Sequence, residues 1–414
     1  MAQRLRKALV IGAGIAGPVA AILLKRAGFD VELFEAWPHS TGAGGGLQIA
    51  PNGMRVLAEI GLADHMMTAG SVSDSFDFYS RSGRKIGSIN RNMSQRFGFP
   101  AVNMRRSDLF EAIIDKAWCE NVELRFEKRL VSIEDRGDHP VVAHFTDGSS
   151  AEGDFLIGAD GVHSMTRQHV LPDGPRPFDT GLIGFGGFAP RSLIDSTSRG
   201  DQIEATLGQS GFFGYGFCSP DRQHGTMWWS TQPSHGIDAA AYRAMDQETI
   251  RRHLLDFHAG WRDPISRILK AAEGIVVTDA FDIATLPVWS RGRTLLIGDA
   301  AHATSPHAGQ GASLALEDAM RLGRLMQEGR ELRETFQAFE QERRSRVERI
   351  VAIARRNGNS KREFTPMGAW IRDRMFTALI PFVAKGMDFM FAYDATRQIR
   401  PRSETSFRHD RQAA

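Results

Sequence analysis

The sequence predicts an α/β fold, made of a Rossmann-like dinucleotide-binding domain, an inserted β-sheet domain and C-terminal helices. Two glycine-rich turns lie far apart in the chain, and each follows a short apolar run typical of a buried parallel strand. Between them, strand-like segments alternate with turns, for example 76–79 before Ser82-Gly83, and this pattern predicts the inserted sheet. A helical pattern follows the second turn.

The first turn has the sequence GAGIAG and lies between a predicted strand at 8–11 and a predicted helix at 15–27. Gly12 allows the tight turn, Gly14 lets the backbone approach a pyrophosphate, and Gly17 lets the helix lie close to the strand. Ala16 belongs to the same turn, where N–H groups and the helix dipole favour phosphate charge. Glu35 ends the next strand, where a carboxylate accepts hydrogen bonds from a ribose. We expect a nucleotide site here, the alternative being a tight turn of an ordinary α/β protein.

The second turn is Gly298-Asp299, after a predicted strand at 294–297. Its aspartate follows the carboxyl end of the strand, where it can accept hydrogen bonds from a sugar-like chain. It could also be an N-cap without a ligand. The loop continues through Pro306, Gly309, Gln310 and Gly311 into a helix from Ala312, whose N-terminus stabilises a negatively charged flat ring. The two turns together predict a dinucleotide held at both ends, which points to FAD and redox chemistry.

Two further motifs lie between these turns: Gly158-Ala159-Asp160-Gly161 after an apolar strand, and Arg106 before a predicted helix. In this order, the four motifs resemble those of the single-component FAD-dependent aromatic hydroxylases, the para-hydroxybenzoate hydroxylase-like monooxygenases. The resemblance covers the chain from Val10 to about Ala395. It departs from the family where Ala36 replaces the arginine that often follows the acid near the adenine, and Arg105 beside Arg106 leaves that assignment open by one residue.

The resemblance implies a role for each matched residue. Glu35 would bind the adenosine ribose, Arg106 the middle of FAD, and Asp299 the ribityl chain. Asp160 would support the flavin site and the approach of the nicotinamide. The remaining implied cofactor contacts are the pyrophosphate turn with Gly12, Gly14, Ala16 and Gly17, the flavin-side stretch Gly45, Gly46 and Leu47, and the loop with Pro306, Gly309, Gln310, Gly311 and Ala312.

The implied reaction is hydroxylation of an aromatic or heteroaromatic small molecule with NADPH or NADH and O₂, through a flavin C4a-hydroperoxide. No second GxGxxG motif is visible, so the nicotinamide would bind transiently. His307, in the loop beside the flavin, is the candidate base for a phenolic proton, although it could simply cap the following turn. Gln48 is a candidate polar substrate contact. The candidate pocket walls are Phe185, Phe213, Tyr215 and Trp228, whose alternative role is core packing.

The motifs divide the chain into three parts. Residues 1–70, 101–175 and 278–360 are expected to form a discontinuous FAD-binding domain. Residues 71–100 and 176–277 are expected to form the substrate domain, and 361–414 a C-terminal helical segment and tail.

Composition limits the other classes of function. The net charge is +2 over 414 residues, so nothing indicates a nucleic-acid partner. Cys119 and Cys218 form no metal motif and no disulfide framework, and we expect no metal and a cytoplasmic setting. The most apolar segment, 376–390, is interrupted by Pro381, Lys385 and Asp388, so we expect an amphipathic helix packed on the protein and no membrane partner. Monomer and homodimer both remain open.

Other readings of the same motifs are an FAD-dependent reductase or epoxidase, and, from a different class, a flavin-binding redox sensor without turnover. The loop that contains Pro306, Gly309, Gln310 and Gly311, called the flavin-side loop below, and the aromatic-rich insertion favour an enzyme. His302 is expected to be a structural histidine beside the second turn.

Overall fold

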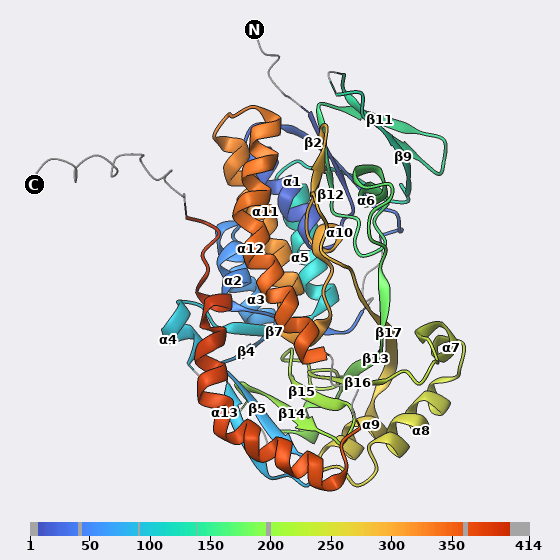
Figure 1. The fold of residues 1–414 in the computed structure, drawn as a ribbon, viewed down its shortest axis with the longest axis vertical. Helices are drawn as coiled ribbons and strands as arrows, with labels where there is room; N and C mark the ends of the chain where they lie inside the picture. The colour runs from blue at the N-terminus through green and yellow to red at the C-terminus, as the bar shows by residue number, and fades with distance from the viewer. Residues whose placement is uncertain are drawn as a thin grey trace, which may run out of the picture.

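The computed structural model describes residues 7–39, 44–89, 92–137, 139–195, 200–358 and 363–397. It has two halves (Figure 1). In the upper half a six-stranded sheet packs against long helices, and in the lower half a seven-stranded sheet carries three short helices. The fold is therefore α/β, as the sequence predicts.

The six-stranded sheet contains the first and last of the predicted motifs. Its spatial order is β18 (Ser290–Arg291), β19 (Thr294–Leu296), β12 (Phe155–Gly158), β1 (Lys7–Ile11), β2 (Asp30–Phe34) and β8 (Glu123–Arg125). All neighbours are parallel except β18 and β19. The strand order reverses at β1, because β2 lies on one side of it and β12 on the other. Ligands bind at this position in open α/β sheets, beyond the carboxyl ends of the strands.

Helices surround this sheet and share its core. Helices α1 (Ala16–Arg26) and α11 (Gly311–Gln327) pack closely, because Gly323 of α11 lets the side chain of Leu23 of α1 approach the helix backbone. The helices of this half are α1 (Ala16–Arg26), α2 (Pro51–Glu59), α3 (Ala63–Ala69), α4 (Met93–Phe97), α5 (Arg106–Cys119), α6 (Met165–Val170), α10 (Asp299–His302), α11 (Gly311–Gln327), α12 (Leu332–Gly358) and the 3₁₀ turn η2 (Pro306–Ala308).

Two three-stranded sheets complete the upper half. One consists of β3 (Gly46–Ile49), β7 (Ala101–Arg105) and β4 (Ser71–Ser73), and it lies between the two large sheets (Figure 1). The other is formed by β11 (Ser150–Gly153), β10 (Val141–Phe145) and β9 (Leu130–Glu134).

The seven-stranded sheet is built from both predicted insertions. Its order is β17 (Glu273–Asp282), β13 (Phe178–Ala189), β16 (Thr226–Pro233), β15 (Phe212–Phe217), β14 (Gln202–Leu207), β5 (Ser75–Ser80) and β6 (Lys85–Ile89). The boundary expected at 277 falls within β17, which stays in this sheet to Asp282. The remaining helices of this half are η1 (Arg191–Leu193), α7 (Ala239–Arg243), α8 (Gln247–Phe257) and α9 (Ile265–Ala271).

The four aromatic residues expected to wall a pocket instead form the core of this half. Phe185, Phe213, Tyr215 and Trp228 are all 2% exposed or less, and all four pack in one cluster with Ile250, Leu254 and Ile268 of the short helices. The expectation was wrong because successive side chains on a strand point to opposite faces. Trp229, adjacent to Trp228, points to the other face. The sequence carries aromatic residues at both parities, so the pattern alone did not identify the face that meets the other half.

The C-terminal segment also differs from the expectation. Helix α13 (Pro366–Ala392) is much longer than the segment 376–390, and it packs along the edge of the seven-stranded sheet at β6 (Figure 1). Only one of its faces is covered. The opposite face is apolar and exposed, so the helix is not amphipathic in the expected sense. By length and composition, α13 is the one helix among the described residues that could cross a membrane.

Candidate functional site

The glycine-rich turn after β1 is shaped by close backbone contacts. A Cβ atom at Gly17 would lie 1.9 Å from the carbonyl oxygen of Gly12, and one at Gly12 would lie 2.4 Å from that of Ala159. Gly12 also has a φ of +99°, which favours glycine. Gly14 differs, because a Cβ there would meet no atom within 4 Å. Gly14 therefore borders open space at the N-terminus of α1, where a phosphate group can approach the backbone.

Glu35 lies at the carboxyl end of β2 and is held against this turn. Its Oε2 accepts a hydrogen bond from the backbone N–H of Ala13 at 2.7 Å, and its Oε1 accepts one from that of Trp37 at 3.0 Å. Trp37 is 66% exposed, and the guanidinium of Arg129 lies 4.5 Å from its ring centroid. An exposed aromatic ring and a cation thus flank Glu35 where the expected family arginine is replaced by Ala36.

Asp299 occupies an enclosed but solvent-accessible position. It begins α10 just beyond β19, and its carboxylate has no hydrogen-bond or ion-pair partner among the described residues. Enclosure by the protein raises the pKa of Asp299, and His302 and Arg106 oppose that shift. Because this solvent-accessible carboxylate has no partner among the described residues, it can accept hydrogen bonds from a ligand.

Arg106, at the start of α5, is exposed, and its Cδ would lie 3.3 Å from a Cβ atom at Gly44. Arg105 points elsewhere, because its guanidinium forms an ion pair with Asp221 of the other half at 2.5 Å. Of the two adjacent arginines, Arg106 is thus the one whose charge acts on Asp299.

A network of buried charges lies beneath the Gly298-Asp299 turn. Asp318 of α11 accepts hydrogen bonds from the backbone N–H of Gly298 at 2.8 Å and from Nε2 of His302 at 2.6 Å. Arg343 of α12 is fully buried between Asp318, at 2.7 Å, and Glu317, at 2.6 Å. His302 is therefore a structural histidine, as expected.

The network continues toward the flavin-side loop. Glu317 accepts a hydrogen bond from Nδ2 of Asn52 at 2.7 Å, and the same amide group donates to Oε1 of Gln310 at 3.0 Å. Gln310 is 1% exposed, so its side chain anchors the loop while its backbone leads into α11. No described side chain caps the N-terminus of α11, and its first N–H groups remain available to a ligand.

His307 lies in the 3₁₀ turn η2, between the two halves. Its Nδ1 is hydrogen-bonded to the hydroxyl of Ser305, and its ring lies 6.2 Å from that of Phe212 in β15. Burial lowers the pKa of His307 from its ordinary value of 6.5, which favours the neutral imidazole. Pro306, which begins this turn, and Gly309, which follows it, are exposed.

Asp160 organises its own turn. One carboxylate oxygen accepts from the hydroxyl of Ser164 at 2.5 Å, and the other accepts from the backbone N–H and the hydroxyl of Thr166, both at 3.0 Å. Arg167 then donates to the carbonyl oxygen of Ala300 at 3.1 Å. Through these contacts the Asp160 motif is connected to the Asp299 turn.

The face of the seven-stranded sheet opposite the short helices is directed at the flavin-side loop. Met227 packs on Gly46 of β3, where an added Cβ would lie 2.6 Å from the Met227 sulfur. Phe212 and Trp229 lie on the same face, with ring centroids 6.3 Å apart. On β14, β15 and β16 this face carries no charged side chain; it is formed by Ile203, Ala205, Leu207, Phe212, Gly214, Gly216, Met227, Trp229 and Thr231. Sequence reasoning missed Phe212, Met227 and Trp229.

Gln48 bridges the two halves through Asn103. Its Nε2 donates to Oδ1 of Asn103 at 2.9 Å, and Nδ2 of Asn103 donates to the carbonyl oxygen of Phe217 at 3.0 Å. The remaining flavin-side positions, Gly45 and Leu47, lie at and next to the start of β3, and Gly45 accepts a hydrogen bond through its carbonyl oxygen from the backbone N–H of Arg106. Gly311 and Ala312 form the first turn of α11.

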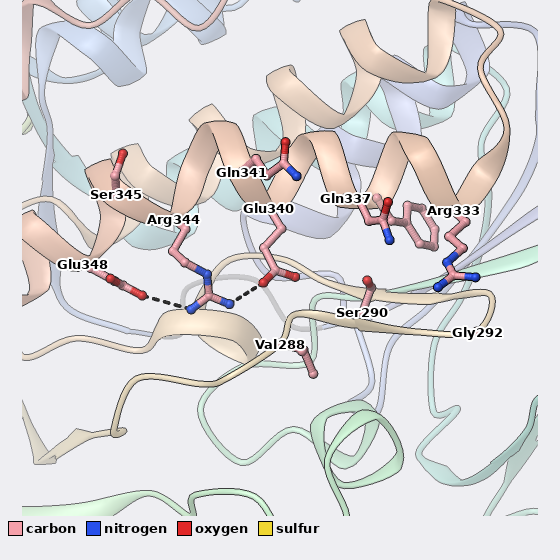
Figure 2. A pocket seen from close by; sticks show the side chains of 11 residues that line it. Val288, Ser290, Gly292, Arg333, Gln337, Glu340, Gln341, Arg344, Ser345 and Glu348 are labelled. Carbon is pink, nitrogen blue, oxygen red and sulfur yellow. Dashed lines mark hydrogen bonds and ion pairs between the residues drawn. The ribbon is translucent and has the colours of Figure 1, made fainter.

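A groove of about 830 Å³ lies elsewhere, on the outer side of α12. Figure 2 shows that Arg344 points into it between Glu340 and Glu348, which both pair with the guanidinium. None of the residues that line the groove belongs to the motifs described above. Among the described residues, no cluster of three or more histidine, cysteine or acidic side chains could hold a metal ion.

Comparison with known proteins identifies the family. A family described as "FAD binding domain" matches residues 6–354. The FAD-dependent urate hydroxylase of Klebsiella pneumoniae subsp. pneumoniae is 31% identical over 355 residues, covering 84% of this chain and 89% of that protein. The chain belongs to the single-component FAD-dependent aromatic hydroxylases. It is a flavoprotein monooxygenase, and NAD(P)H is the typical electron donor of its family.

Other relatives give the same assignment. The 6-hydroxynicotinate 3-monooxygenase of Bordetella bronchiseptica is 30% identical, covering 84% of this chain and 90% of that protein. The crystal structure of Klebsiella pneumoniae HpxO complexed with FAD and uric acid has a TM-score of 0.82 to this monooxygenase, with 28% identity, covering 94% of this chain and 97% of that chain. The para-hydroxybenzoate hydroxylase-like fold predicted from the sequence is confirmed.

We predict that Asp318→Asn destabilises the protein and reduces its sensitivity to acid. Burial alone would raise the pKa of Asp318, but His302 and Arg343 outweigh it and lower that pKa from 3.8 to about 2. Because the folded-state pKa is depressed, Asp318 contributes stability above pH 4, and this contribution is lost as the pH falls toward 2. Urea unfolding at pH 7 should show a loss of roughly 3 kcal/mol, because Arg343 loses a buried partner.

The stability of the variant should also change less than that of the parent between pH 5 and pH 3. Asp173→Asn is the matched control, because Asp173 is an exposed aspartate outside the network. Equal unfolding free energies for Asp318→Asn and the parent at pH 7 would contradict the structural role of the network.

Proposed function

We propose that this monooxygenase hydroxylates a planar, uncharged aromatic or heteroaromatic small molecule. The observation that carries this proposal is the uncharged face formed by β14, β15 and β16, with Phe212, Met227 and Trp229 beside the flavin-side loop. A substrate carboxylate buried against this face would lack a charged partner, and burial of an unpaired charge is costly. The relatives named for urate and 6-hydroxynicotinate act on planar heteroaromatic rings, which supports the planar ring of the proposal, whereas the absence of charge is proposed from the uncharged face alone.

The residues of the upper half fit FAD. Gly14 leaves space for a pyrophosphate, Asp299 offers an enclosed carboxylate for hydroxyl groups, and the N-terminus of α11 offers uncapped N–H groups for a flat anionic ring. We assign the adenosine ribose to Glu35 and the middle of the cofactor to Arg106. When bound, FAD would supply the transfer of electrons from NAD(P)H to O₂.

The protein has three tasks around the cofactor: to orient the substrate, to exclude water and to move one proton. Phe212, Met227 and Trp229 would form an apolar wall over the ring and exclude water. Gln48 would contribute a polar contact through its Oε1, since its Nε2 is engaged by Asn103. Gly45, Gly46 and Leu47 with Pro306, Gly309, Gln310, Gly311 and Ala312 would surround the ring through their backbone.

We further propose His307 as the base that removes a phenolic or ring N–H proton from the substrate. The imidazole lies between Ser305 and Phe212, at the boundary of the two halves, and burial keeps it neutral near pH 7. A deprotonated substrate is a stronger nucleophile, so removal of this proton favours attack on an electrophilic oxygen. Cytoplasmic localisation and the choice between monomer and homodimer remain predictions.

Replacement of Asp299 by alanine should weaken FAD binding, so that the purified variant loses FAD, without unfolding the protein. Since Asp299 has no partner among the described residues, its loss leaves no described protein group unpaired, whereas the cofactor loses charge-assisted hydrogen bonds. Equilibrium titration of apoprotein with FAD should show affinity reduced by roughly tenfold or more. Circular dichroism should be unchanged, and Asp173→Ala should bind normally. Normal flavin stoichiometry and affinity in Asp299→Ala would exclude this assignment.

The substrate proposal is tested by the anaerobic rate at which NADPH and NADH bleach the flavin absorbance. The panel contains phenols, purines and polyketide-like aromatics, each paired where possible with its carboxylated counterpart. We expect one uncharged planar compound to accelerate bleaching strongly and its carboxylate to do so less. Faster bleaching with the carboxylate would refute an uncharged substrate. Fast bleaching regardless of the compound would favour a reductase, and no bleaching would favour a redox sensor.

His307→Gln tests the base, with the most effective panel compound as substrate. Product formation by the parent should fall only once the pH is below the ordinary histidine pKa of 6.5, because burial lowers the pKa of His307 and the base is protonated below that lowered pKa. The variant should lose this pH dependence and roughly 100-fold in product formation, while anaerobic flavin bleaching remains normal. His169→Gln is the control, because His169 is another partly buried histidine whose pKa is lowered by burial. An unchanged pH profile in His307→Gln would leave only the turn-capping role.

A further inference from the structure

The outer face of helix α13 is rich in exposed apolar side chains, with the cations Arg374 and Lys385 among them. The apolar side chains are Met367, Trp370, Ile371, Met375, Leu379, Phe382 and Val383, which recur at intervals of three and four residues and therefore share one side of the helix. Phe382 is 76% exposed and Met367 is 73% exposed. Side chains of this size rarely form an uncovered patch on a soluble protein, so the patch indicates a contact with something apolar.

The inner face of α13 is packed on the protein, which fixes the direction of the outer face. Ile380 fits against Gly87 of β6, where an added Cβ would lie 2.4 Å from it. Phe376 contacts Phe78 with ring centroids 5.2 Å apart, and Phe391 contacts Phe97 at 5.7 Å. A helix that is apolar on both sides is found in protein cores and in membranes. Because one side is held along the sheet, α13 cannot cross a bilayer without leaving it, so it would lie in the plane of a membrane surface.

Two partners could cover this face: a second copy of the chain or a lipid surface. The charges on the helix distinguish between them. The exposed charged side chains that α13 adds to this surface are Arg374 and Lys385. The carboxylates of the helix are occupied, because Asp373 is bound by Arg372 and Asp388 by Arg96. A second copy of α13 would therefore bring like charges together, whereas an anionic lipid surface provides their counterions. Trp370, with the guanidinium of Arg374 5.2 Å from its ring, is of the type found at the membrane interface.

We propose that the outer face of α13 docks this monooxygenase onto an anionic lipid surface. This replaces the expectation, drawn from sequence, that no membrane takes part. The bound helix would place its apolar stripe among the acyl chains, with Arg374 and Lys385 at the level of the headgroups. The seven-stranded sheet would then lie next to the membrane, because α13 packs on β6 and Arg372 donates to the carbonyl oxygen of Gly208 at 2.7 Å.

Flotation of the FAD-loaded full chain with lipid vesicles tests this proposal. Vesicles of phosphatidylcholine with phosphatidylglycerol should carry the protein upward, and vesicles of phosphatidylcholine alone should carry much less. Leu379→Gln combined with Phe382→Ser should reduce the bound fraction by roughly tenfold or more. Arg374→Gln with Lys385→Gln should remove the preference for the anionic lipid. Phe178→Ser with Ile237→Gln is the matched control, because it removes two exposed apolar side chains elsewhere and should leave binding unchanged.

A second measurement does not depend on loss of binding. In a Cys119→Ser background, an environment-sensitive fluorophore on Phe382→Cys should brighten with anionic vesicles, whereas the same label on Val131→Cys should not. Failure of the parent to float, or equal flotation of Leu379→Gln/Phe382→Ser, would overturn the proposal. A dimer in light scattering that dissociates in that double variant would also overturn it, because a second copy would then be the partner.

Discussion

The buried pairing of Arg343 with Glu317 and Asp318 is the interaction on which the cofactor half depends. These three side chains are wholly excluded from solvent, and they join α11 and α12 beneath the Gly298-Asp299 turn. The removal of charged groups from water costs free energy, so each buried charge needs an opposite charge and hydrogen-bond partners close to it. Asp318 meets this requirement with Arg343, His302 and the N–H of Gly298, and Glu317 does so with two arginines and Asn52. One network thereby fixes the turn that carries Asp299 and the loop that precedes α11.

The sequence predicted features that depend on neighbouring residues, and it did not predict those that depend on contacts between residues far apart in the chain. Gly12, Gly17 and Gly298 are needed because the backbone passes close to itself or adopts a positive φ, and such local requirements are visible as motifs. Arg343 lies in a helix rich in arginine and glutamate, a composition that usually indicates a solvated surface. Its partners are on α11, so only the tertiary packing shows that it is buried. The overall fold and the cofactor motifs were therefore predictable, and the network that supports them was not.

Periodicity explains why the sequence did not predict which aromatic residues face the cleft or that one face of α13 is exposed. In β15 and β16 aromatic residues occupy both faces, as the adjacent Trp228 and Trp229 show, so a period of two cannot tell core from cleft. In α13 apolar residues occupy both sides of the helix, so a period of 3.6 cannot tell the packed side from the exposed one. In both cases the second apolar face is the one for which a partner outside the chain must be sought.

The two halves are connected at the place where both face the proposed substrate. Met227 rests on Gly46, Asn103 joins Gln48 to the backbone of Phe217, and Arg105 pairs with Asp221. The same sheet is bound by α13 at the hairpin between β14 and β15, through the contact of Arg372 with Gly208. That hairpin leads directly to Phe212, which touches His307. A lipid surface held by α13 would thus lie one hairpin away from the proposed base. The two proposals therefore rest on different residues that are connected through one sheet, since α13 packs on β6 at its edge and Phe212 begins β15 within it.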